Sequence, residues 1–383
     1  MILCGARVAM SPDRAEPADI AVGYGRVAAI GRVPGRRRID CGGYLILPGL
    51  VNAHDHLDFD LFPRLGDGPW ESAAEWACDI HRRFEERIGE ILAIPLRDRL
   101  IWGGLRNLLS GVTTVCHHNP SHRVFGERFP VRVVRAFAWA HSLHFTRDLQ
   151  HRHQCCPSSR PFVFHAGEAV NGVGAREMET LARLGLFAAN SVMVHAVGMN
   201  SEMLSLAQAR GCSLVWCPSS NLFILGRTLS REVLESDLPV ALGTDSTLTA
   251  EGDMFDELHV ARKVSGLSDA RLYRMVTAVP ARVLRLEHGE GAIQRGGVAD
   301  FLLFRDRGLT PARTLLSDMP EAVFVGGRPQ MLSADLLAAW SSALPQLARF
   351  HPLTITGRGA RYVHSEIPPL PAGFSVGGRQ VLS

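Results

Sequence analysis

The chain has 383 residues, of which 46% are hydrophobic, and a formal net charge of +3. It is long enough to bury a large α/β domain with an accessory lobe. Its 41 basic and 38 acidic residues are spread along the chain without a basic tract interleaved with aromatic residues, which argues against a nucleic-acid-binding protein.

Eight cysteines without C-x-x-C spacing are typical of a reduced, intracellular protein. The opening stretch "MILCGARVAM" lacks the basic and apolar regions of a signal peptide, and no run reaches the roughly 18 apolar residues of a membrane span. We therefore expect a cytoplasmic protein that acts on a small molecule, binds neither nucleic acid nor membranes, and is either a monomer or a homo-oligomer such as a dimer.

The sequence divides into segments of different periodicity. Residues 1–47 alternate short apolar runs with glycine turns, which predicts β-structure. Over residues 48–288, β-branched runs alternate with helical stretches such as "RDRLIWGGLRNLLSG" and "AREMETLARLG", which predicts parallel βα units in a barrel. Short strands return over residues 289–335, so both ends are expected to build one small β lobe. The extension over 336–383 is predicted to be partly irregular and to pack on the barrel or on a neighbouring subunit.

Seven runs qualify as barrel strands, one fewer than a (β/α)8 barrel needs. They are the run before His54, "GVTTVCH", "VRVVRAFAWA", "PFVFHAGE", "SVMVHAVG", "CSLVWCPSS" and "PVALGTDS". The segment 141–160, "HSLHFTRDLQHRHQCCPSSR", is where an irregular eighth strand is expected. Its four histidines and two cysteines suit either a second metal site or, as its arginines favour, a solvated loop.

Ligand-type side chains end several of these strands. His54 and His56 end the first strand, and the two-residue repeat of a strand points both the same way. His165 ends "PFVFH", His195 ends "SVMVH" and Asp245 ends "PVALGTD". Because the carboxyl ends of barrel strands meet at one face, we expect these side chains to converge.

Three imidazoles and one carboxylate suit a divalent transition metal ion such as zinc or iron(II), with one position left for water. The ion lowers the pKa of that water, a nearby carboxylate can carry its proton, and another imidazole can polarise the bond under attack. Glu168 follows His165 by three residues. Taken alone, His195 could equally be a buried histidine with a structural role, and Asp245 could cap the helix that follows it. Packing alone does not explain ligand-type residues at four strand ends.

Seven motifs, in order, resemble the amidohydrolase superfamily, and within it the cytosine deaminase and chlorohydrolase branch. They are "LPGLVNAHDHL", "GVTTV", "HAGE", "VHAVG", "CPSSN", "GTDS" and "GGVADFLLF", and the resemblance extends from the first strands to about residue 330. It implies a distorted TIM (β/α)8 barrel, a β-sandwich lobe built from both termini, one divalent metal ion and hydrolysis at carbon.

The resemblance also implies roles for individual residues. His54, His56, His165 and Asp245 match the metal ligands, Asp245 also accepts a proton, Glu168 matches the proton shuttle, and His195 matches the histidine that contacts the substrate or the attacking hydroxide. The only lysine, Lys263, follows Asp245 on a predicted helix. It therefore cannot supply the carboxylated lysine that bridges two metals in binuclear members, and a single ion is favoured. A cysteine or glutamate bridge stays open.

The predicted loops after the strands offer substrate contacts. Trp70 suits stacking on a flat ring or a lid, and His118 and Asn119 suit bonds to a ring edge or to their own loop. Asn221 also falls on this face. We predict a mononuclear metal-dependent amidohydrolase that deaminates a heterocyclic amine. Hydrolysis of a cyclic (lactam-type) or linear amide, displacement of ring chloride and a catalytically silent scaffold are the alternatives.

Overall fold

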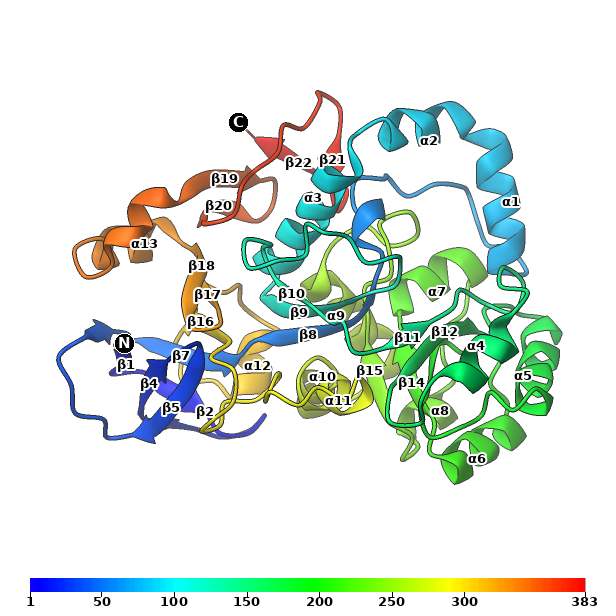
Figure 1. The fold of residues 1–383 in the computed structure, drawn as a ribbon, viewed down its shortest axis with the longest axis horizontal. Coiled ribbons are helices and arrows are strands. Elements are labelled where there is room, and N and C mark those ends of the chain that lie inside the picture. The colour runs from blue at the N-terminus through cyan, green and yellow to red at the C-terminus, as the bar shows by residue number, and fades with distance from the viewer. Residues whose placement is uncertain (383) are drawn as a thin grey trace.

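The computed structural model describes residues 1–382, which form a parallel barrel beside a lobe of two β-sheets (Figure 1). The lobe takes its strands from both ends of the chain, and the barrel takes its strands from the segment between them. The predicted fold class is therefore confirmed. No helix within the described residues is long and apolar enough to cross a membrane.

The barrel contains eight parallel strands, which follow one another along the chain. They are β8 (Leu50–Asp55), β9 (Val112–His117), β10 (Arg132–Val133), β11 (Ala138–Trp139), β12 (Phe162–Ala166), β13 (Ser191–His195), β14 (Ser213–Trp216) and β15 (Val240–Leu242). Strands β8, β9 and β10 pair in that order in one sheet, and β11, β12, β13, β14 and β15 pair in that order in a second sheet. A parallel bridge between Asp55 and Asp245 connects the first strand to the last.

The eighth strand lies where the sequence suggested only one strand. The run at residues 131–140 bends after Val133, so that β10 pairs with β9 and β11 pairs with β12. The expected location at 141–160 is wrong, because this segment forms a turn followed by helix α4 (Leu149–Cys155). The run "VRVVRAFAWA" carries no glycine or proline that would mark such a bend, so the sequence reads as one strand.

Helices follow the barrel strands and cover its outside (Figure 1). Beyond α4 they are η1 (Leu57–Phe59), α1 (Ala73–Arg83), α2 (Glu85–Leu92), α3 (Leu96–Leu109), α5 (Val173–Arg183), α6 (Ser201–Arg210), α7 (Pro218–Leu225), α8 (Arg231–Glu235), α9 (Met254–Ser265), α10 (Asp269–Met275) and α11 (Ala278–Val283). Helices α3 and α5 coincide with the two helical stretches predicted from the sequence.

The lobe is a sandwich of a four-stranded and a ten-stranded sheet. The smaller sheet contains β5 (Arg26–Gly31), β4 (Asp19–Gly23), β1 (Ile2–Cys4) and β6 (Arg38–Asp40). The larger contains β21 (Ser375–Val376), β22 (Arg379–Leu382), β19 (His351–Ile355), β20 (Gly359–Val363), β18 (Arg328–Leu332), β17 (Ala322–Val325), β16 (Phe301–Arg305), β7 (Tyr44–Pro48), β2 (Arg7–Ala9) and β3 (Ala15–Pro17). The antiparallel pairing of β7 with β16 joins the two ends of the chain.

The C-terminal extension adds four strands to the larger sheet and also contacts the barrel. The short helices α12 (Pro311–Leu315), α13 (Ala334–Trp340) and η2 (Pro345–Arg349) precede these strands. Arg358 contacts Asp253 at 2.7 Å, and the amide of Gly252 donates to the carbonyl of Gly377 at 2.9 Å. Residues 366–374 run outside regular elements, as predicted. The boundaries after residues 47, 288 and 335 stay predictions.

Candidate metal centre and active site

Four predicted ligands meet at the carboxyl ends of the barrel strands. The ligand atoms of His54, His56, His165 and Asp245 all lie within 4.8 Å of one another, and all four residues are buried. Nε2 of His54 lies 3.1 Å from Nε2 of His165 and 3.4 Å from Oδ1 of Asp245. Nε2 of His56 lies 3.6 Å from the same oxygen. The strand ends β8, β12 and β15 thus converge as predicted.

Strand geometry aims the first two histidines at this centre and turns Asp55, which stands between them, the other way. Oδ2 of Asp55 accepts hydrogen bonds from Asn52 (3.0 Å), Asn107 (2.8 Å) and Thr244 (2.9 Å). Arg106 lies 3.5 Å from the same carboxylate oxygen. This buried network fixes the end of β8, which is why Asp55 does not join the metal ligands.

Asp245 occupies a strained backbone position. Its φ is +57°, in the left-handed region that costs a non-glycine residue about 1–3 kcal/mol. Gly243 precedes it without a side chain, because a Cβ there would lie 2.9 Å from the Cβ of His54. Ser220 and Thr249 donate to Oδ2 of Asp245 at 2.6 and 3.1 Å, which leaves Oδ1 facing the histidines.

The protonation states suit metal binding. Burial lowers the pKa of His54 to about 3 and lowers the pKa of His165 well below its ordinary value, so both imidazoles are neutral and offer lone pairs. Burial alone would raise the pKa of Asp245, but the hydrogen bond with His54 and the neighbouring histidines hold that pKa below its usual range. Asp245 therefore supplies a carboxylate.

This donor set fits a small divalent metal ion that keeps a fifth position for water. Nitrogen and oxygen ligands at about 2.05 Å from zinc, at angles of about 90–120°, lie about 2.9–3.6 Å apart. The separations of 3.1, 3.4 and 3.6 Å fall in that range. Within residues 1–382 this is the one group of three or more histidine, cysteine and acidic side chains with such spacing.

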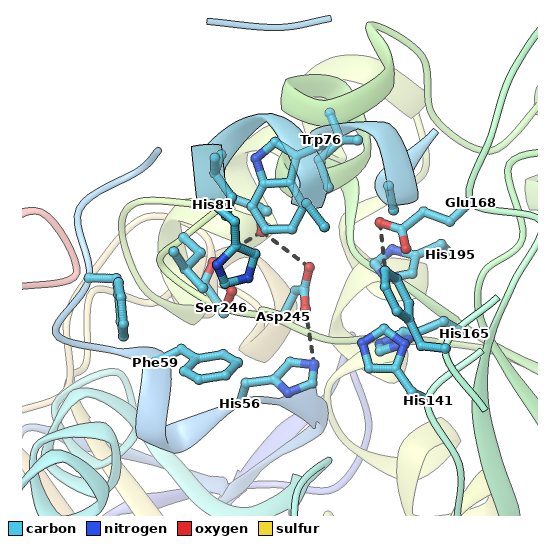
Figure 2. A pocket seen from close by; sticks show the side chains of 18 of the residues that line it. His56, Phe59, Trp76, His81, His141, His165, Glu168, His195, Asp245 and Ser246 are labelled. Atoms are coloured by element: carbon cyan, nitrogen blue, oxygen red, sulfur yellow. Dashed lines mark hydrogen bonds and ion pairs between the residues drawn. The ribbon is translucent and has the colours of Figure 1, made fainter. Parts of the chain in front are cut away.

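Glu168 and His195 stand beside the ligands (Figure 2). Oε1 of Glu168 lies 3.6 Å from Nε2 of His195. Burial, reinforced by the charges of Asp245 and Glu177, raises the pKa of Glu168 well above its ordinary value and so favours the protonated carboxyl. Such a group can release and recover a proton during a reaction.

His195 is fixed by Asn221. Nδ1 of His195 donates to Oδ1 of Asn221 at 2.8 Å, and burial lowers the pKa of the imidazole. The neutral ring therefore presents the lone pair of Nε2 towards Glu168. His195 also has a positive φ, +71°. Strain at both His195 and Asp245 is the kind of backbone cost that accompanies a functional site.

His141 is a site residue that the sequence did not single out. Its Nδ1 lies 3.4 Å from Nδ1 of His165, and its carbonyl accepts the amide of His165 at 2.7 Å. It lies two residues after the short strand β11, which the sequence did not reveal as a separate strand. Only its position at the end of the strand that precedes His165 could have indicated that it belongs to the site.

A cavity of about 440 Å³ opens next to the ligands. Trp76 and His81 of α1 lie across it from His56 and Phe59 (Figure 2). Apart from the polar groups at the metal cluster, His81, Ser246 and Thr249, its walls are apolar and are formed by Phe59, Phe62, Ala73, Trp76, Ala77, Ile80, Ile88, Leu92, Phe145, Ile224 and Leu248. The indole Nε1 of Trp76 donates to the carbonyl of Leu65 at 3.0 Å, so its hydrogen-bonding group is already satisfied.

The four predicted substrate contacts lie outside this lining. Trp70 packs on Phe223 with ring centroids 5.7 Å apart. His118 is buried beside the ligands, where its Nε2 contacts the carbonyl of Ala140. Asn119 donates to Asp58 at 2.9 Å, and Asn221 contacts His195. Their roles in substrate binding stay predictions.

The segment 141–160 forms no second metal site. His153 contacts Ser191 at 3.0 Å, and the ring of His151 lies 3.6 Å from Sγ of Cys155. No group of three metal-ligating side chains occurs there in the described chain. The interpretation of 141–160 as a solvated loop was therefore better than that of a second metal site, although the segment includes helix α4 and His141 contacts the ligand His165.

Known proteins resemble this chain over most of its length. The Amidohydrolase family matches residues 163–329. A 5-methylthioadenosine/S-adenosylhomocysteine deaminase of Syntrophobacter fumaroxidans is 26% identical and aligns over 83% of this chain and 88% of its own. The zinc-bound atrazine chlorohydrolase of Arthrobacter aurescens superposes with a TM-score of 0.70 at 19% identity, covering 89% and 98% of the two chains. A zinc-bound adenosine deaminase of Xanthomonas campestris gives 0.63 at 19% identity, covering 90% and 99%.

A barrel with three histidines and one aspartate at its mouth defines a metal-dependent hydrolase. The family match over residues 163–329 and the relatives confirm the predicted resemblance. The chain is a metal-dependent hydrolase similar to the amidohydrolases, enzymes that act on C–N bonds other than peptide bonds, which argues against the scaffold alternative.

Proposed function

We propose that the enzyme deaminates a heterocyclic aromatic amine. The observation that carries the proposal is the buried carboxyl of Glu168 beside a His–His–His–Asp cluster, at one end of a largely apolar cavity, where burial raises its pKa. Such a carboxyl can protonate a ring nitrogen, and the apolar walls suit a flat ring. The deaminase names of several relatives agree with this chemistry.

His54, His56, His165 and Asp245 are proposed to hold one divalent ion, Zn²⁺ in preference to Fe²⁺. Zinc suits three imidazoles and one carboxylate, and solved relatives contain it. When bound, the ion makes a water molecule acidic enough to attack at neutral pH. Without the ion, the cluster would bring four ligand atoms together without adding to the stability of the fold.

The side chains around the cluster then manage protons. Glu168 gives its proton to the ring nitrogen beside the carbon under attack, which makes that carbon more electrophilic. Asp245, held at Oδ2 by Ser220 and Thr249, accepts one proton of the attacking water. The second water proton, on the hydroxyl now bound to the ring carbon, passes to the carboxylate of Glu168 and restores its starting state. Asp245 then gives its proton to the amine, which leaves as ammonia. The lone pair on Nε2 of His195 accepts a hydrogen bond from the attacking water.

Amide hydrolysis and displacement of chloride use the same machinery and remain the alternatives. Mass spectrometry of metal-loaded enzyme with a panel of heterocyclic amines and cyclic amides separates them. We expect a product in which an amino group has become an oxo group, with ammonia released. A product that has gained a whole water molecule would instead establish an amide hydrolase.

Variants test the assignment of Glu168. Glu168→Gln should retain the metal and lose at least ~100-fold in kcat, because an amide cannot carry the proton. His54→Ala should lose the metal itself. Glu257→Gln is the matched control, because Glu257 is another glutamate whose pKa burial raises, to about 7, but which does not line the cavity. Equal activity in the two glutamine variants would reject the shuttle. A cytoplasmic location and a homodimer stay proposals from the sequence.

A further inference from the structure

The first helix after the metal-binding strand has its apolar stripe on the cavity. Ala73, Trp76, Ala77, Ile80 and His81 all line the cavity, at the i, i+3, i+4, i+7 and i+8 positions that share one face of α1. Normally such a stripe packs against the protein core. Here Ile80 and Trp76 also contact the core, but the same face forms a wall of the cavity, where an apolar part of the substrate can cover it.

The next helix continues this wall to the cavity mouth. Ile88 and Leu92 of α2 line the cavity four residues apart, and Phe145 lines it as well. Leu92 and Phe145 are 49% and 48% exposed. Large apolar side chains that stay this exposed at a cavity mouth indicate contact with an apolar part of a ligand.

Charged groups are confined to the other end. Among the described residues that line the cavity, the only Asp, Glu, Lys or Arg side chains are Glu168 and Asp245, both at the metal cluster. The nearby arginine of α1, Arg83, is committed to ion pairs with Asp67 and Asp79. The wall therefore offers no carboxylate to an ammonium group, and to a carboxylate it offers no lysine or arginine but only the imidazole of His81.

We infer that the substrate is a heterocyclic amine with an uncharged, apolar substituent, and that the enzyme rejects the same heterocycle carrying a zwitterionic amino-acid tail. This inference rests on the proposed deaminase function. The two compounds in the name of the relatives illustrate the distinction, because 5′-methylthioadenosine has an uncharged tail and S-adenosylhomocysteine a zwitterionic one. The cavity of about 440 Å³ lies within the usual range of roughly 300–1,000 Å³ for small-molecule sites, so charge and not size decides.

Binding to the metal-loaded Glu168→Gln variant tests the inference without requiring turnover. Calorimetry would compare 5′-butylthioadenosine, whose tail matches the homocysteine chain in length, with S-adenosylhomocysteine. An unpaired charged group in an apolar site should weaken binding by about 100-fold. Equal affinity for the two compounds, or binding of neither, would overturn the inference. The proposed function fails separately if wild-type enzyme deaminates no heterocyclic amine of the panel.

A pair of arginine variants tests whether the wall is responsible. Leu92→Arg places a cation at the mouth and should raise the affinity for S-adenosylhomocysteine relative to the butyl thioether by about tenfold. Leu96→Arg is the control, because Leu96 is 42% exposed but does not line the cavity, and its ratio should stay at the wild-type value. Unchanged ratios in both variants, or equal changes in both, would reject the role of the wall.

Discussion

Replacing Arg106 by methionine should destabilise the protein strongly, because this side chain neutralises two buried carboxylates behind the metal centre. Its side chain is 4% exposed, while those of Asp55 and Asp60 are fully buried. It contacts Asp60 at 2.8 Å and Asp55 at 3.5 Å, and its Nε donates to the carbonyl of Gly252 at 2.7 Å. After the change, Asp55 keeps three hydrogen-bond donors, whereas Asp60 keeps none among the described residues.

One uncompensated buried charge costs about 3–5 kcal/mol of unfolding free energy. Urea unfolding of the metal-free protein, followed by far-UV circular dichroism, measures it. The control is Arg99→Met, because Arg99 is also buried in α3 but donates only to the carbonyls of Ile94 and Asp58. That variant should lose only about 1–3 kcal/mol. The deficit of Arg106→Met should shrink at acidic pH, where the buried carboxyls are neutral. Equal losses in the two variants at neutral pH would refute the reasoning.

Two further predictions concern the active site. Asn221→Leu removes the acceptor that orients His195, so kcat should fall about 10–100-fold while the metal content stays constant; loss of the metal in this variant would show a different role. In metal-free protein, Glu168 keeps its proton to higher pH than in the unfolded chain, so stability should fall as pH rises from its ordinary pKa of 4.5 through the raised pKa of the folded state. Glu168→Gln should therefore match wild type in Tm near the acidic end and exceed it at pH 8. Parallel Tm curves would contradict this.

The histidine ligands converge because their positions follow from strand order and periodicity, whereas Asp245 lies beyond the end of β15 with a left-handed backbone. His54 and His56 share a face of one strand, and the ends of β12 and β15 meet that strand in any parallel barrel. The eighth strand escaped prediction for the opposite reason. Its separation from β10 depends on a bend inside one apolar run, and the tertiary pairing with β9 and β12 produces that bend.

The substrate wall was less predictable, because loop side chains take their direction from tertiary contacts. Trp70 and Trp76 are both close to the metal-binding strand in sequence, yet only Trp76 reaches the cavity. The stripe of small and apolar residues around Trp76 was visible as a helical repeat. Its orientation was not, since a stripe normally signals core packing.

The wall and the proton shuttle are physically joined. The amide of Ala73, at the start of α1, donates to the carbonyl of Glu168 at 3.1 Å, and the amide of Val170 donates to the carbonyl of Glu71 at 2.9 Å. An antiparallel bridge between Ser72 and Ala169 lies between these bonds. A substituent that presses against α1 therefore acts on the backbone that carries Glu168. Because binding energy from a remote part of a substrate can be used to position the reacting groups, a substrate that leaves this wall uncovered should lose turnover as well as affinity.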